Sequence, residues 1–254
     1  MTINTYQRVL DELSAVGFSG RFSPFLQCEP LLDKRLPELI SMTRKSLPRA
    51  KLLIQSNGDM LTVTKGILLF KAGLHKLIIN CYDNENGRLD RLRSVADEIT
   101  KQMPDVSHVR GGFNRMIRQG PSNYIPMEIT IEDKTKWTMD GQENWAGNVP
   151  GIHLTRQPVR ARCFRPFNQL YIHYNGNVVL CCCDWKGEVV FGNLLEESLG
   201  KIFSGPLATM YRQNLNNKNR NMKLCDVCDF PGSIPLPVRI ADRVTNFVNR
   251  FRDR

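Results

Sequence analysis

The sequence predicts an α/β protein in which parallel strands alternate with helices, followed by a smaller α+β region that is built differently. In the first 132 residues, apolar runs of strand length alternate with amphipathic runs of ten or more residues, and turn residues separate them. Parallel neighbours need a crossover of that length, and such crossovers are right-handed, so these units are expected to wind into an open sheet or a barrel. A dense group of cysteines marks the second region.

The elements of the first region follow one another at short intervals. Residues 5–18 place apolar side chains on one face at helical spacing, and Gly17 can end this helix. The later elements are a strand in 20–26, a helix in 34–47, a strand in 50–55, a helix in 61–73, a strand in 75–83, a helix in 87–103, a strand in 106–110 and a strand in 126–133. Ligands of parallel sheets bind at the carboxyl ends of the strands, so the loops at 27–30, 56–58 and 80–84 are the expected binding loops.

The second region begins after a polar stretch, 133–160, that shows no periodicity and is predicted to be a connector. A hairpin is expected around the Asn175-Gly176 turn signal, between strands at 169–174 and 177–183. A short strand near 189–193 and helices near 196–203 and 207–215 complete this region. The last residues, 231–254, are predicted to form a basic amphipathic helix that caps the fold or a partner.

The composition is typical of a folded protein, with 41% hydrophobic and 24% charged residues. No stretch has the apolar length of a membrane span, and the first residues lack a secretory pattern, so a cytoplasmic location is predicted. The formal net charge of +10 raises the question of nucleic acid. No segment interleaves aromatic and basic residues as a base-stacking surface would, so a solvated basic surface is the preferred interpretation and neither nucleic acid nor membrane is an expected partner.

Six of the eight cysteines lie between residues 163 and 228: Cys163, the run Cys181-Cys182-Cys183, and the pair Cys225-x-x-Cys228. A C-x-x-C pair on a turn lets two thiolates bind one metal ion or two corners of a cluster. The predicted hairpin would bring the strand that carries the cysteine run back beside the segment after Cys163. Inert burial of all six cysteines is the alternative, and a metal site is favoured by the spacing. Structural zinc sites usually use two close pairs, and only one is present, which favours an iron–sulfur cluster over zinc.

The run of three cysteines sits at the end of a predicted strand. Successive strand residues point to opposite faces, so Cys181 and Cys183 are expected to share one face, with one of them a ligand. Cys182 is then predicted to be buried as a small hydrophobic residue.

The segment from Cys163 through Gly176 to Cys181, with spacings of twelve and four residues, resembles the opening of the SPASM or Twitch extension of radical S-adenosylmethionine enzymes. The stretch GNLLEESLGKIF and the closing CDVC are similar to the rest of that extension. The resemblance implies one auxiliary [4Fe-4S] cluster held by Cys163, Cys181, Cys225 and Cys228. No cysteine follows Cys228, which is the pattern of the shorter, single-cluster form.

The first half resembles the partial (β/α) barrel of the same family, without its first strand. Glu29-Pro30 stands where members carry a Gly-Glu-Pro motif whose acidic residue binds the amino group of S-adenosylmethionine, although Cys28 replaces the glycine. Ser56-Asn57-Gly58 is similar to the following Thr-Asn-Gly segment. The resemblance therefore implies Glu29, Ser56 and Asn57 as cofactor contacts. The predicted domain organisation is a partial barrel over 1–132, a connector over 133–160, the cluster-binding domain over 161–230 and a tail over 231–254.

One departure from the family is large. Members bind the cluster that cleaves S-adenosylmethionine through a C-x-x-x-C-x-x-C loop, and these 254 residues contain no such triplet. The sequence is therefore expected to be a truncated, split or degenerate member of a hydrogen-abstracting family, in which a partner chain could supply the missing segment. The intact family acts on small molecules or peptides. The alternative, from another class, is a non-catalytic module stabilised by zinc or a cluster, with a basic surface for nucleic acid or a protein partner.

Overall fold

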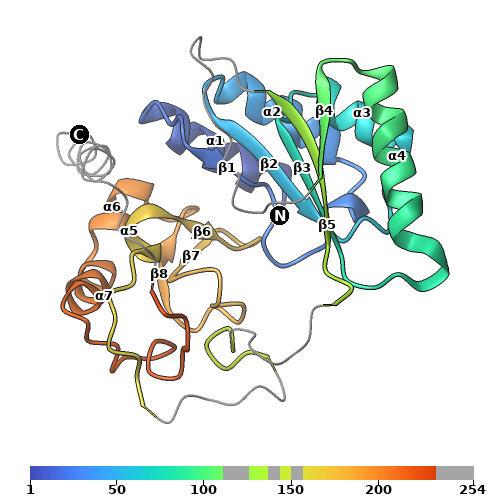
Figure 1. Ribbon diagram of the computed structural model, residues 1–254. Helices are drawn as coiled ribbons and strands as arrows, with labels where there is room; N and C mark the ends of the chain where they lie inside the picture. Colours follow the sequence, from blue (N-terminus) through green and yellow to red (C-terminus); the bar gives the residue numbers. More distant parts are fainter. Residues whose placement is uncertain (111–125, 137–143, 150–156, 233–254) are drawn as a thin grey trace. The chain divides into compact units, whose positions relative to one another are not determined.

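The computed structural model describes residues 1–110, 126–136, 144–149 and 157–232 (Figure 1). Most of the predicted tail, 233–254, and much of the predicted connector lie outside these residues. No helix in the described part of the chain has the length and apolar character needed to cross a membrane.

The chain divides into two compact units. Residues 17–137 form one, called the sheet unit below; residues 1–16 and 138–254 form the other, called the cysteine unit. Helix α1 (Ile3–Ala15) thus groups with the C-terminal half of the chain, whereas the sequence-based boundaries had placed it with the sheet.

The sheet unit confirms the prediction of parallel strands alternating with helices (Figure 1). Its elements are β1 (Arg21–Phe22), η1 (Pro30–Leu32), α2 (Leu36–Ser46), β2 (Lys51–Ser56), α3 (Val63–Lys71), β3 (Lys76–Cys81), η2 (Glu85–Gly87), α4 (Arg88–Gln102), β4 (Val106–Arg110) and β5 (Met127–Asp133). The strands form one sheet in the order β1-β2-β3-β5-β4, with every neighbouring pair parallel.

The last two strands therefore do not follow chain order, because β5 lies between β3 and β4. Strand β5, with the sequence MEITIED, places Ile129 and Ile131 in the core, whereas β4, with the sequence VSHVR, lies at the edge of the sheet and has the exposed residue Ser107. A strand with neighbours on both sides is more buried than an edge strand.

The two faces of the sheet differ in polarity. On one face, Leu77 and Ile79 of β3 align with Ile129 and Ile131 of β5, and all four are buried. On the other face, the same two strands align Lys76 with Glu128 and Asn80 with Glu132. The polar side chains stand at alternate positions, as the period of a strand requires.

The cysteine unit has shorter elements: α5 (Arg165–Asn168), β6 (Tyr171–Ile172), β7 (Asn177–Val179), β8 (Val190–Asn193), α6 (Leu199–Ser204) and α7 (Pro206–Asn216). Strands β6, β7 and β8 form an antiparallel sheet in that order, which confirms the predicted hairpin. Gly176 has φ +89°, a conformation that glycine adopts without strain, so it suits this turn.

Helix α1 is bonded to this unit by its polar side chains. The Glu12 carboxylate accepts a hydrogen bond from the backbone N–H of Leu199 at 3.0 Å, at the start of α6. The Arg8 guanidinium donates to the carbonyl of Leu194 at 3.3 Å. A carboxylate at a helix N-terminus satisfies an otherwise unpaired donor, so Glu12 links the first helix to residues almost two hundred positions later.

The expectation for the cysteine run was wrong. Strand β7 ends at Val179, so the run lies in the turn that follows and strand alternation does not apply to it. Cys183 is the fully buried residue, while Cys182 is partly exposed. The chain bends here because the buried carboxylate of Asp184 accepts from the N–H groups of Glu188 at 2.7 Å and Val189 at 2.9 Å.

Candidate cluster and cofactor sites

The cysteines named by the sequence come from three segments of the cysteine unit. Cys163 precedes α5, Cys181 follows β7, and Cys225 and Cys228 lie in the loop after α7. Cys181, Cys225 and Cys228, together with Cys182, pack against one group of buried side chains that includes Leu180, Cys183, Val189, Tyr211 and Leu224. All of these cysteines are free thiols.

The electrostatics of the thiols extend this grouping to Cys163. Burial raises the pKa of Cys225, and the charges of Cys181, Cys228 and Cys163 raise it further. Burial likewise raises the pKa of Cys163, and the charge of Cys181 acts in the same direction. Four thiols that influence one another in this way would repel as thiolates, so a positively charged core is needed to hold them deprotonated together.

This donor set is suited to an iron–sulfur cluster. Within the described residues, no three His, Cys, Asp or Glu side chains are arranged around a position for one metal ion. A cubane takes four thiolate ligands, one on each iron atom, and the sequence supplies four thiols from three segments of this unit. The chemistry of this donor set fits the cluster that the sequence implied.

Cys183 has a supporting contact that the sequence did not indicate. Its thiol donates a hydrogen bond to the sulfur of Cys228, which is the main reason that the pKa of Cys228 falls to about 7 despite burial. The Arg165 guanidinium in turn donates to the Cys183 sulfur at 3.3 Å. The buried member of the cysteine run thus stabilises the charged form of the last cysteine.

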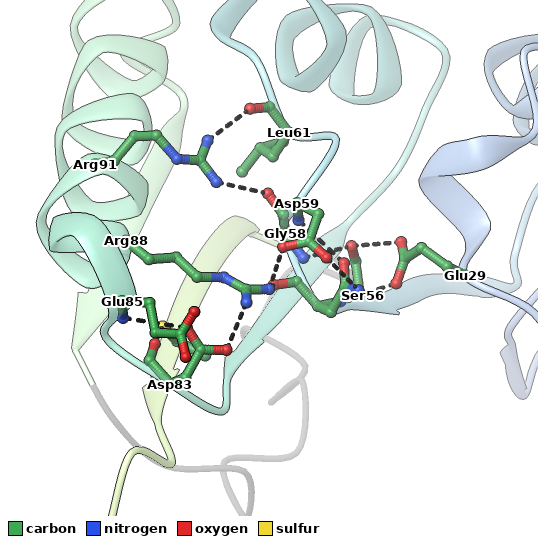
Figure 2. A network of polar contacts seen from close by, with 11 residues as sticks. Glu29, Ser56, Gly58, Asp59, Leu61, Asp83, Glu85, Arg88 and Arg91 are labelled. Carbon is green, nitrogen blue, oxygen red and sulfur yellow. Dashed lines mark hydrogen bonds and ion pairs between the residues drawn. The ribbon is translucent and has the colours of Figure 1, made fainter.

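The three residues implied as cofactor contacts meet in the sheet unit (Figure 2). Glu29 Oε1 accepts from the Ser56 hydroxyl at 2.6 Å and from the Leu31 N–H at 3.0 Å, and Oε2 accepts from the Asn57 N–H at 2.9 Å. Glu29 therefore begins η1 and also fixes the turn after β2. Proline at position 30 suits the first turn of that short helix.

Two arginines of α4 hold the neighbouring loops in place, as Figure 2 shows. Arg88 donates to the Asp83 carboxylate at 2.7 Å and to the Asn57 carbonyl at 3.1 Å, and it also forms an ion pair with Asp59. Arg91 donates to the carbonyls of Gly58 at 3.2 Å and Leu61 at 3.3 Å. Sequence analysis did not identify either residue. The available signal was that the two arginines are three positions apart at the start of a helix that follows an expected binding loop, so both lie on one helix face.

The polar face of the sheet carries buried oxygens that no described residue satisfies. Asn80, Thr130 and Glu132 are 8%, 1% and 7% exposed, and the atoms Asn80 Oδ1, Thr130 Oγ1 and Glu132 Oε1 have no hydrogen-bond partner among the described residues. Burial raises the pKa of the Tyr82 phenol, and the charges of Glu132 and Glu29 raise it further. The unsatisfied oxygens lie in the carboxyl half of β3 and β5, and β3 is the neighbour of β2, the strand that ends at Ser56.

This group was also missed from the sequence. The polar residues of MEITIED at every second position were its only signal. Unsatisfied buried polar groups are rare in folded proteins, and a ligand is one reason for them.

Comparisons with known proteins find similarity over the cysteine-bearing region and over most of the chain. The family model described as SPASM, iron–sulfur cluster-binding domain, matches residues 163–229. The S-adenosyl-L-methionine-dependent 2-deoxy-scyllo-inosamine dehydrogenase of Niallia circulans is 25% identical over 225 residues, which cover 88% of this chain and 78% of that protein.

Two solved structures share the fold. BtrN in complex with AdoMet and 2-DOIA matches with a TM-score of 0.69 and 24% identity, over 91% of this chain and 80% of that chain. Native anSMEcpe with bound AdoMet matches with a TM-score of 0.50 and 11% identity, over 100% of this chain and 90% of that chain. A SPASM domain implies an iron–sulfur cluster. The predicted resemblance is therefore confirmed: residues 163–229 match the SPASM iron–sulfur cluster-binding domain, and the chain is similar to an S-adenosyl-L-methionine-dependent dehydrogenase over most of its length.

Proposed function

We propose that the chain binds one [4Fe-4S] cluster through Cys163, Cys181, Cys225 and Cys228. The observation that carries this proposal is the grouping of these thiols, from three separate segments, on the cysteine unit. The buried hydrophobic side chains that pack against Cys181, Cys225 and Cys228 limit the access of water to these sulfurs. When bound, such a cluster supplies one-electron redox chemistry or an iron atom that anchors a substrate.

We further propose that S-adenosylmethionine binds beside Glu29, Ser56 and Asn57. A carboxylate offers about four acceptor positions, and Glu29 uses three of them for Leu31, Ser56 and Asn57, which leaves capacity for an ammonium group. The solved relatives with bound AdoMet support a site for this cofactor. The role of this chain's residues is to orient the cofactor, because both carboxylate oxygens are held in place by the protein.

The substrate we propose is a small molecule that carries hydroxyl and ammonium groups. Asn80, Thr130 and Glu132 present acceptor oxygens on one face of β3 and β5, and a ligand rich in donors would satisfy them. The curated relative acts on 2-deoxy-scyllo-inosamine, which supports a substrate of this class. Binding of the cluster, of S-adenosylmethionine and of this substrate is the function proposed for these residues.

Metal analysis of anaerobically reconstituted protein tests the cluster. We expect iron and acid-labile sulfide in equal amounts, about four of each per chain, with broad visible absorption. Substitution of any one of the four cysteines by alanine should lower the iron content, while Cys28→Ala, in the sheet unit, should leave it unchanged. One zinc per chain without sulfide would contradict the proposal and support the zinc-stabilised module instead.

Titration calorimetry with S-adenosylmethionine tests the cofactor site. Glu29→Gln keeps the size of the side chain but removes its charge, and we expect affinity to fall about tenfold or more because a charge-assisted hydrogen bond is lost. Glu38→Gln, in the first turn of α2, is the matched control. Equal affinity of the wild type and Glu29→Gln would refute this part of the proposal.

A further inference from the structure

Arg220 is a buried arginine in the loop after α7. The residue is only 2% exposed, and its guanidinium donates hydrogen bonds to three backbone carbonyls. Nε donates to Ala161 at 2.9 Å, Nη1 to Phe230 at 2.6 Å and Nη2 to Arg162 at 3.5 Å. Rigid, planar donors of this kind can hold several acceptors in a fixed geometry.

The three carbonyls flank the cysteines at both ends of the site. Ala161 and Arg162 directly precede Cys163, and Phe230 follows Cys228 by two residues. One side chain therefore ties the first cysteine-bearing segment to the last, across more than sixty positions of sequence.

Within the described residues, no carboxylate is paired with the positive charge of Arg220. Its acceptors are neutral carbonyls, and among the described residues no acidic side chain forms an ion pair with it. A buried charge without a counter-charge is costly, so a negative group nearby would stabilise it. The cysteine sulfurs beside its acceptors are the groups placed to do so.

We propose that Arg220 is a positioning residue that holds the two cysteine-bearing segments together and raises the reduction potential of the cluster bound between them. This inference rests on the proposed cluster. In the redox step, a low-potential one-electron donor reduces the oxidised cluster, which gains one negative charge without breaking a bond or taking up a proton. A fixed positive charge close to the sulfurs stabilises the more negative, reduced form, and net charge is one determinant of such potentials.

A redox titration of reconstituted protein with dithionite, followed by electron paramagnetic resonance, tests the charge effect. In Arg220→Gln we expect the ratio of reduced to oxidised cluster at a given potential to fall about tenfold, a shift of about 59 mV for one electron. Arg220→Lys keeps the charge and should stay closer to the wild type. Arg212→Gln is the control, because that half-buried arginine of α7 bonds the carbonyl of Phe203 and stacks on its ring.

Hydrogen exchange of the metal-free protein tests the positioning role independently. Arg220→Gln should raise amide exchange together in 159–164 and 228–232, and Arg212→Gln should not. Unchanged exchange in both segments would overturn the positioning role, and equal potentials for Arg220→Gln and the wild type would overturn the charge effect. If the wild type binds no cluster, the proposed function fails, whereas the exchange experiment still decides whether Arg220 joins the segments.

Discussion

The two units of this chain are stabilised in different ways. The sheet unit has five parallel strands and a continuous apolar face, with Leu77, Ile79 and Ile129 fully buried. The strands of the cysteine unit are two, three and four residues long, and one of the buried clusters of this unit is formed partly by cysteines. Short strands supply few backbone hydrogen bonds, so the segments that carry the cysteines are expected to gain stability from a bound iron–sulfur cluster. The sheet unit has no such dependence, because its long strands and apolar face are already paired and buried.

Each unit also contains buried polar groups that a ligand would stabilise. In the sheet unit, three acceptor oxygens on β3 and β5 have no hydrogen-bond partner among the described residues. In the cysteine unit, the buried guanidinium of Arg220 donates to three carbonyls but pairs with no described carboxylate. The oxygens favour a donor-rich small molecule and the guanidinium favours an anion, so the two proposed ligands differ in chemistry.

The strongest test of this difference is loss of one cluster ligand. Cys228→Ala should lose most of the bound iron and raise amide exchange in 171–179 and 190–193 by about tenfold or more, because metal binding and folding are coupled. Exchange in β2 and β3 should not change. Hydrogen-exchange mass spectrometry measures both units at once. Cys182→Ala is the control and should retain iron, and identical behaviour of the two variants would remove the distinction between ligand and non-ligand.

A pair of glycines tests the packing of the sheet unit. Gly58 and Gly87 both have positive φ, +80° and +70°, but a Cβ at Gly58 would lie 2.6 Å from Ile79 Cγ2, whereas one at Gly87 meets nothing within 4 Å. We expect Gly58→Ala to lower the free energy of unfolding by about 3 kcal/mol and Gly87→Ala by about 1 kcal/mol, since only the first adds a clash to the backbone strain. Urea unfolding followed by circular dichroism measures both. Equal losses would show that the contact with Ile79 relaxes.

The sheet unit should also respond to mild acid. The His75 Nδ1 accepts from the Leu52 N–H at 3.0 Å and lies 2.9 Å from the Arg44 guanidinium. Burial first, and then the charges of Arg44 and Lys51, lower the pKa of His75 to about 4 from an ordinary value of 6.5. Between these values the unfolded state binds more protons, so stability is lost as the pH falls through this window.

The size of this effect is smaller than that of the glycine clash. Because the imidazole is only partly buried, we expect a loss of about 1 kcal/mol from pH 7 to pH 5 after solvent screening. In His75→Gln, the stability of the sheet unit should depend less on pH. Amide exchange rates of residues 51–56 at pH 7 and pH 5 measure this stability. If the variant loses as much stability as the wild type between these pH values, other groups cause the acid response.

The smallest effect uses matching helix caps in the two units. Thr62 accepts a hydrogen bond from the Lys65 N–H at 3.2 Å at the start of α3, and Thr2 accepts from the Thr5 N–H at 3.1 Å at the start of α1. Each Thr→Ala change should cost about 0.5–1 kcal/mol. Thr62→Ala should raise exchange in the sheet unit and Thr2→Ala in the cysteine unit. If Thr2→Ala acts on the sheet unit instead, α1 has been assigned to the wrong unit.

Most helices and strands could be predicted because their signals are local. The apolar periodicity of α4, the apolar run at 77–79 in β3 and the Asn175-Gly176 turn each depend on neighbouring residues alone. The cysteine positions and the Glu29-Pro30 pair were equally visible, because a spacing along the chain does not depend on the surroundings.

The remaining features depend on distant parts of the chain meeting in space. The position of β5 between β3 and β4, the burial of Cys183 instead of Cys182, and the contacts of Arg220 with segments on either side of the site are of this kind. Sequence by itself determined which elements form and which thiols are available to a cluster. Only the tertiary structure decided which side chains are buried without a partner, because burial is set by how the loops close on one another and not by the order of the residues.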